Sequence, residues 1–377
     1  MKKFFLLAAA ALVVFTACTK IEEADSVPAR KITFQAASYV PQTKANVSVL
    51  KEFSAFKCKA FLHAAGYTAA NETQDMFGAN GETIKPYDSN DAELTNLTAE
   101  STNVAYWAPS HDYYWPKDAS SYVNFVAWYD KNGAPTTATE TSLVWTIDGS
   151  TRSLATSDNI LFADEAWHFK QNTSPATYGM NGVSEGVPML FHHALAQLCI
   201  QAKVTQATDE KTPAHTWDVT LEDIKLSGVY NKGTLTLSNT EPSGSTTAST
   251  VAWTSTTTGI WTPSGDTTSI SMANVTTPLT TDTVSVLRMQ NVLPQTVTDD
   301  VVLKFKYKIS YKYDGTEYAH EKITENVQLN HITDAIDKWE MNKKITYVIT
   351  IDPVKTVIRI DPAMVDWEEV AGGSTTL

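Results

Sequence analysis

The sequence predicts an all-β protein, and three observations support this fold class. Residues 302–313 alternate between apolar and polar side chains, which is the period of a strand with one face in a core. Asp314 and Gly315 follow directly and are a two-residue signature of a type I′ hairpin turn. Turn residues separate further alternating runs about every ten residues, as in a β-sandwich, and no convincing longer amphipathic helix is evident.

The length of the chain predicts two domains. Residues 1–17 have the pattern of a signal peptide, and the remainder of the 377 residues is too long for one compact core. A stretch rich in Gly, Pro and Asn near the middle of the chain is typical of a linker. We therefore expect an acidic tether or propeptide over 18–30, an N-terminal β-sandwich over 31–185 and a C-terminal β-sandwich over 186–377.

The N-terminus shows the three parts of a secretory signal: two lysines, an apolar run and small residues before a cysteine. The apolar run of about 12 residues is shorter than the ~20 that a helix needs to cross a bilayer. Phe15, Thr16, Ala17 and Cys18 resemble a bacterial lipobox, which implies cleavage between Ala17 and Cys18 and acylation of Cys18. Several acyl chains hold a protein firmly on a membrane, since each buried CH₂ contributes ~0.8 kcal/mol.

The acidic residues after Cys18 resemble an export signal for the cell surface; the alternative is a solvated tether without an addressing role. The net charge of −13 and the lack of a basic face exclude nucleic acid as a partner. Besides Cys18 there are two cysteines. Cys58 falls on the apolar face of one strand-like run and Cys199 on the polar face of another, so we expect no disulfide between them.

The sequence predicts no enzyme, no cofactor and no metal site. It contains no glycine-rich phosphate loop, no HExxH, no GxSxG and no paired CxxC. His192 and His193 are adjacent, so in a strand they point to opposite faces and cannot share a metal by themselves. Asp164 and Glu165 form one of several carboxylate pairs, which we interpret as solvated groups at loop ends.

The ten tryptophans suggest an alternative function. Trp107, Trp115, Trp128 and Trp145 lie in the first predicted domain, and exposed aromatic rings stack on sugars. A surface glycan-binding lipoprotein is therefore the alternative to a structural role. Trp128 lies within a strand-like run, however, which favours packing in a core or on a sheet face.

Several landmarks, in order along the chain, carry a family resemblance. After the lipobox come KITFQAASYVPQTKA, DYYWPKDASSYVNFVAWYD, TSDNILFADEA, VPMLFHHALAQLCIQAKV, VYNKGTLTL, WEMNKKITYVITID and VDWEEV. Together they resemble the fimbrillin family, the pilins of type V pili in Gram-negative anaerobes. The resemblance implies two tandem sandwiches of transthyretin-like topology in a stalk, tip or accessory subunit of surface fimbriae that serves adhesion.

The resemblance also implies how the subunit matures. It implies export as a lipoprotein to the outer membrane, cleavage by an Arg-specific protease and assembly with other pilin subunits by β-strand exchange, without catalysis or cofactor. The candidate cleavage sites are Arg30, before the first alternating run, and Lys44, after it. We expect cleavage at Arg30, which leaves the first strand in place, whereas cleavage at Lys44 removes that strand.

The candidate donor strand lies near the C-terminus. The segment TVIRIDPAMVDWEEV is apolar and close to a chain end, as strand addition requires. Ile358, Ile360 and Val365 are its expected anchors. The segment also resembles the last strand of the family, so pairing within its own domain is the alternative.

Overall fold

The computed structural model confirms the all-β prediction. Its described residues form β-strands and contain no helix, and none of these residues belongs to a helix able to cross a membrane. The residues that the structure describes are 31–38, 54–64, 74–95, 97, 104–170, 186–210, 215–243, 247–255, 261–281, 284–319, 323–355 and 357–367.

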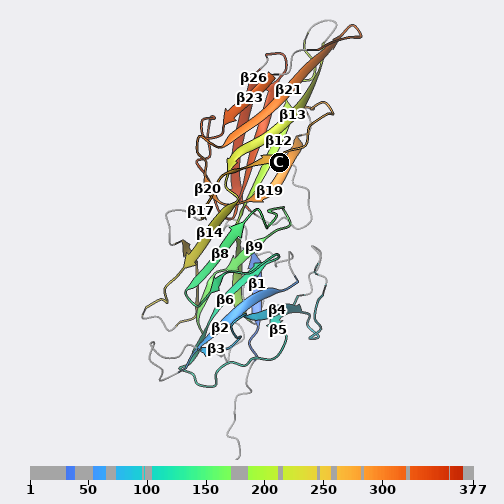
Figure 1. Ribbon diagram of the computed structural model, residues 1–377. Helices are drawn as coiled ribbons and strands as arrows, with labels where there is room; N and C mark the ends of the chain where they lie inside the picture. Colours follow the sequence, from blue (N-terminus) through green and yellow to red (C-terminus); the bar gives the residue numbers. More distant parts are fainter. Residues whose placement is uncertain are drawn as a thin grey trace, which may run out of the picture.

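The first part of the chain is organised around one large sheet (Figure 1). Its strands are β1 (Phe34–Ser38), β2 (Phe56–His63), β3 (Gln74–Asp75), β4 (Glu82–Tyr87), β5 (Tyr106–Pro109), β6 (Tyr122–Asp130), β9 (Ile160–Ala163), β10 (Glu165–Phe169), β11 (Val187–His193) and β15 (Ser249–Val251). Because β6 pairs with both β9 and β2, the strands β6-β9-β11-β1-β5-β4-β2 close into a ring. We call this ring the N-terminal barrel, and its interior holds a buried apolar core.

The last part of the chain is a sandwich of two sheets. One sheet has the order β19-β12-β25-β26, and the other has the order β18-β13-β21-β22 with β23 also paired to β21. The strands of the first are β12 (Ala196–Val204), β19 (Ser285–Val292), β25 (Lys343–Asp352) and β26 (Val357–Asp366). Those of the second are β13 (Thr216–Val229), β18 (Thr268–Ser271), β21 (Val302–Tyr313), β22 (Thr316–Ala319) and β23 (Ile323–Gln328).

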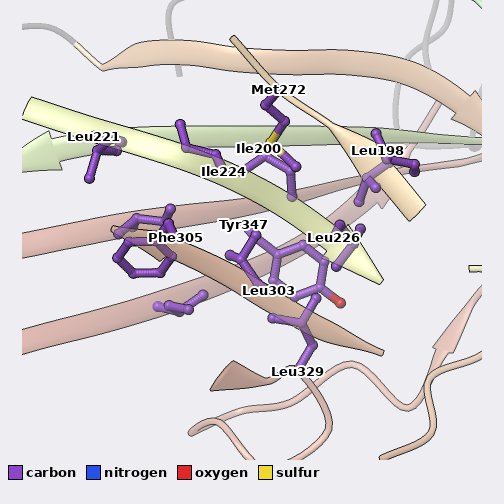
Figure 2. Packing of buried hydrophobic residues seen from close by; sticks show 14 of the residues in the cluster. Leu198, Ile200, Leu221, Ile224, Leu226, Met272, Leu303, Phe305, Leu329 and Tyr347 are labelled. Atoms are coloured by element: carbon purple, nitrogen blue, oxygen red, sulfur yellow. The ribbon is translucent and has the colours of Figure 1, made fainter. Parts of the chain in front are cut away.

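The alternation of β21 produces the core of this sandwich. Leu303 and Phe305 of β21 lie in one buried core with Leu198 and Tyr347 of the facing sheet, and Tyr347 lies close to Leu303 in Figure 2. The predicted turn is also confirmed, because Asp314 and Gly315 join β21 to β22 with φ angles of 48° and 76°. Both angles are positive, as a type I′ turn requires.

A third layer joins the two halves of the chain. It contains β7 (Thr137–Ala138), β8 (Ser142–Asp148), β14 (Lys232–Ser238), β16 (Thr254–Ser255) and β17 (Thr262–Pro263), while β20 (Gln295–Thr296) and β24 (Lys338–Trp339) form a separate pair. β8 pairs with β14 over seven residues, and a core with residues from both halves lies here. Hydrogen bonding therefore crosses the predicted division at 185/186. β11, which follows this division, belongs to the barrel, and β15 also joins the same sheet by pairing with β10.

The two cysteines within the described ranges are free, as expected. Cys58 is buried in the barrel core, in agreement with its apolar strand face. The predicted exposure of Cys199 is wrong, because its side chain is also buried. The reason is that β12 is an inner strand: Met289 of β19 and Thr346 of β25 stand beside Cys199 on either side.

Candidate strand-exchange site

β1 occupies an interior position in the N-terminal barrel although it lies close to the N-terminus. It runs parallel to β11 with five consecutive residue pairs, from Phe34↔Val187 to Ser38↔Phe191. On its other side it pairs with β5 at one position only, Phe34↔Trp107. β1 is therefore held mainly by one neighbouring strand, yet it completes the ring.

The side chains of this segment fill the centre of the barrel. Phe34 is fully buried, and its ring centroid lies 5.3 Å from that of Phe125 and 6.2 Å from that of Phe56, in edge-on arrangements. Ile32 and Ala36, two residues to either side, are also buried. Removing β1 would therefore leave an apolar groove, bordered by main-chain groups of β11 that have lost their partners.

The main chain directly before β11 lies close to the backbone of β1. Gly186 has a φ of 118°, and a Cβ built on it would lie 2.8 Å from the carbonyl carbon of Phe34. Only glycine fits this approach without displacing the main chain. The amide of Val187 then donates to the carbonyl of Thr33 at 2.8 Å, which aligns the parallel pair.

Of the two predicted cleavage sites, Arg30 and Lys44, neither lies in the described ranges, but both flank β1 closely in sequence. At the N-terminal side, Lys31 forms a salt bridge of 2.9 Å with Asp112, and the amide of Ile32 donates to the carbonyl of Tyr113. The lipobox residues, Ala17 and Cys18 included, also lie outside the part of the chain that the structure describes.

The predicted donor segment forms β26, the edge strand of its own sandwich. It pairs antiparallel with β25 along ten residues. Ile360 is buried, Ile358 packs partly against the core, and Val365 is 47% exposed. The structure thus shows the own-domain pairing for this segment, and its use as a donor stays a prediction.

The end of β26 contacts the junction between the two halves of the molecule. Trp367 is buried, and its ring stacks on that of His193 with centroids 3.8 Å apart and planes 1° from parallel. Asn342 connects the same region: its side-chain oxygen accepts from the amide of His193, and its carbonyl accepts from the amide of Trp367. The C-terminal strand therefore contributes to two cores.

A partly buried polar cluster lies where β2, β6 and β10 meet the third layer. His63 contacts Glu140 at 2.5 Å, and His168 contacts Glu241 at 2.8 Å. Tyr122 also donates to Glu241, at 2.6 Å. His168 has a φ of 61°, at the irregularity in the pairing of β10 with β6.

Glu165 lies in this cluster without a hydrogen-bond partner. Its side chain is fully buried, and neither carboxylate oxygen has a partner. Burial raises the pKa of Glu165 to about 9, and the negative charges of Glu140 and Glu241 act in the same direction. The interpretation of Asp164 and Glu165 as solvated groups is therefore wrong: Glu165 belongs to β10, which is covered on both faces, and Asp164, between β9 and β10, is also buried.

The aromatic and histidine residues singled out in the sequence are packed. Trp107, Trp115, Trp128 and Trp145 are all buried, which removes the basis for a sugar-binding surface made of these residues. His193 is buried against Trp367, while His192 contacts Asp164 at 2.8 Å. Across the described ranges, no group of three or more His, Cys, Asp or Glu side chains is arranged to hold a metal ion.

Comparisons with known proteins give several matches over most of the chain. No protein of curated function matches significantly. Similar solved structures include a fimbrial protein from Bacteroides vulgatus, with 16% identity, a TM-score of 0.46 and coverage of 89% of this chain and 99% of that one. The fimbrial anchor protein Mfa2 from Porphyromonas gingivalis has 9% identity, a TM-score of 0.31 and coverage of 90% and 98%. A protein-family model described as fimbrillin-like matches residues 63–367.

Proposed function

The chain belongs to the fimbrillin-like family, and from this premise we propose that it is a structural subunit of surface fimbriae that assembles by exchanging a β-strand and serves adhesion. In this proposal it is exported as a lipoprotein to the outer membrane, and its partners are other pilin subunits. The role involves no catalytic step and no cofactor. The observation that carries the proposal is β1, a core strand flanked by the basic residues Arg30 and Lys44.

Removal of β1 is the step that would prepare the subunit for assembly. Burial of an Ile or Phe side chain stabilises a fold by roughly 1.5–3 kcal/mol, and β1 with its preceding residues contributes Ile32 and Phe34. A barrel without them exposes apolar side chains and the main-chain groups of β11. A strand from another subunit restores both the pairing and the burial, which is the mode of β-strand addition.

β26 supplies a suitable donor. It is an edge strand, so it leaves its sandwich by breaking a ladder with β25 alone. Val357, Met364 and Val365 are exposed in the present position, at 52%, 39% and 47%. These side chains gain burial when they enter a groove, and this gain offsets the loss of Ile360 and Trp367 from their own cores.

The burial of Phe34 in the barrel changes the expected cleavage site from Arg30 to Lys44, because exchange at this groove requires removal of β1; assembled subunits are therefore expected to begin at Ala45. Cleavage after Lys44 removes β1 and opens the groove, whereas cleavage after Arg30 leaves Phe34 in the barrel. The measurement is mass spectrometry of the N-terminal peptide from fibres sheared off the cell surface and resolved as an SDS-resistant ladder. A ladder of subunits that begin at Lys31 would show that β1 is retained and would contradict exchange at this groove. Absence of any ladder would contradict the fimbrial role itself.

The lipid attachment is tested separately. Cells that express Cys18→Ala are expected to incorporate no radiolabelled palmitate into this chain, because the lipobox resemblance assigns the acyl groups to Cys18. Cys199→Ala serves as the control, since Cys199 is a buried free thiol within the folded part and should not affect labelling. Labelling of the Cys18→Ala chain at the wild-type level would refute the lipoprotein assignment.

A further inference from the structure

At the hairpin end of β21, aromatic side chains form a row across β13, β21 and β22 of the C-terminal sandwich. Trp217 of β13 stands opposite Tyr311 of β21, and Tyr311 stands opposite Tyr318 of β22. The centroids of Trp217 and Tyr311 are 5.0 Å apart. Those of Tyr311 and Tyr318 are 4.9 Å apart, with ring planes 15° from parallel. The row therefore crosses three adjacent strands on one face of the sheet.

Two rings at this end are open to solvent. Tyr318 is 44% exposed and Tyr313 is 38% exposed. Tyr318 lies on β22, the last strand of its sheet, so its inner face rests on Tyr311, and among the described strands none of the same sheet covers its outer side. A flat aromatic ring at a strand edge, supported from behind, presents one face to a ligand.

The rings are held in place by a polar contact beneath them. His215 packs against Tyr313 and Tyr311, with ring centroids 4.8 Å and 5.1 Å apart. Asp209, whose side chain is only 8% exposed, lies 2.7 Å from the Nδ1 of His215 and accepts from its backbone amide at 2.9 Å. The cluster is thus pre-organised, and a ligand binds to it without the cost of ordering these side chains.

We propose that Tyr318 and Tyr313 form a binding site for a pyranose ring of a neutral glycan. One face of a pyranose presents C–H groups and stacks on an aromatic ring, while its hydroxyl groups require polar partners at the rim. The outer edge of β22, whose residues Thr316–Ala319 are all exposed, supplies main-chain donors and acceptors. This site lies outside β1 and β26, so it is independent of the proposed strand exchange.

The placement of the charged residues on β21 and β22 favours a neutral sugar. Lys312 alternates with the tyrosines and points to the opposite face, where its ammonium group lies 3.5 Å from the carboxylate of Asp218. Glu317 is exposed and stands opposite Lys312, so it points to that same face, away from Tyr318. Because the ammonium group of Lys312 lies on the far face of the sheet and is paired with Asp218, an acidic sugar stacked on Tyr318 gains no favourable charge from it.

The exposed area is too small for a stable protein interface. A tyrosine side chain contributes 150–250 Å² when buried, so the exposed parts of the two rings offer roughly 200 Å² at most. A stable protein–protein interface buries about 800 Å² on each partner. A single sugar ring matches the smaller area, and repeated subunits in a fibre multiply a weak contact through avidity.

The test uses the full chain in native gels that contain a neutral polysaccharide, with galactomannan, arabinogalactan, xylan and β-glucan as the probes. We expect at least one of them to retard the wild-type chain. Tyr318→Ala should bind about tenfold more weakly, because the stacking face is removed, whereas Tyr318→Phe should bind nearly as well. Tyr114→Ala is the matched control, since Tyr114 is 45% exposed but belongs to the N-terminal half.

Several results would overturn the proposal. They are the absence of retardation by all four polysaccharides, equal retardation of Tyr318→Ala and wild type, or equal losses in Tyr318→Ala and Tyr114→Ala. Binding restricted to sialylated or sulfated glycans on a printed oligosaccharide array would exclude a neutral ligand. A shift of Tyr318→Ala from dimer to monomer in size-exclusion chromatography, without an effect on glycans, would assign the rings to a contact between copies of the chain.

Discussion

A chain that begins at Ala45 is expected to lose the stability of its N-terminal barrel and to regain it when a peptide of residues 31–38 is added. The peptide restores Ile32 and Phe34 to the barrel core and the five pairs between β1 and β11. Changing Phe34 to Ala in the peptide should weaken binding by at least ~100-fold, because loss of a buried Phe costs about 3–5 kcal/mol. The measurements are thermal unfolding with and without peptide, and titration calorimetry.

A second peptide tests the donor. Residues 357–367 should compete with the 31–38 peptide for the same groove if β26 is the exchanged strand. The control is the 31–38 peptide with Lys31 changed to Ala, which affects only an exposed ion pair with Asp112 and should bind nearly as well as the parent. If the chain that begins at Ala45 unfolds at the same temperature as the chain that retains β1, or does not bind the 31–38 peptide, β1 is not the removable strand. If only the second peptide fails, the donor lies elsewhere.

Glu165→Gln is expected to stabilise the protein at neutral and alkaline pH. The pKa of Glu165 is about 9 in the folded state, against 4.5 for a glutamate side chain in water, so the folded state holds a proton that the unfolded state has lost between these values. The contribution of protonated Glu165 to the stability of the fold is therefore fully present below pH 4.5 and declines as pH rises towards 9. At pH 7 the loss is on the order of 3 kcal/mol, and glutamine avoids it because it carries no charge.

The measurement is urea unfolding of both chains at pH 4.5, 7 and 8.5. The stability difference should be small at pH 4.5 and grow with pH. Glu317→Gln is the matched control, because Glu317 is exposed and its substitution should leave the pH profile unchanged. Parallel profiles for the wild type and Glu165→Gln would mean that Glu165 does not retain its proton on folding.

The all-β class was predictable because some strands are buried on one face only. β21 alternates cleanly, and the Asp314-Gly315 turn after it has the geometry that its sequence indicates. The partners of the strands were not predictable in this way. The parallel pairs β1/β11 and β12/β25 join segments far apart in the sequence, and alternation is the same for parallel and antiparallel neighbours.

The candidate site shows the same limit. The flanking Arg30 and Lys44 could be identified from sequence, but the burial of Phe34 at the centre of a closed ring depends on contacts with distant strands. Glu165 was misjudged because β10 is buried on both faces and therefore lacks the period-two pattern that identifies strands. A carboxylate in such a strand resembles a loop residue when only its neighbours in sequence are considered.

The parallel pairing of β1 with β11 has a mechanical consequence. A strand in this position is bonded along its length to β11, so a force that pulls on one of its ends acts along the ladder. Under such a load the consecutive bonds are strained together in shear, whereas a strand peeled sideways breaks them one after another. Detachment under tension is governed by the rate of crossing that barrier and not by equilibrium stability. A donor strand that pairs with β11 in the place of β1 is therefore suited to link subunits of a fibre that is stretched by flowing fluid.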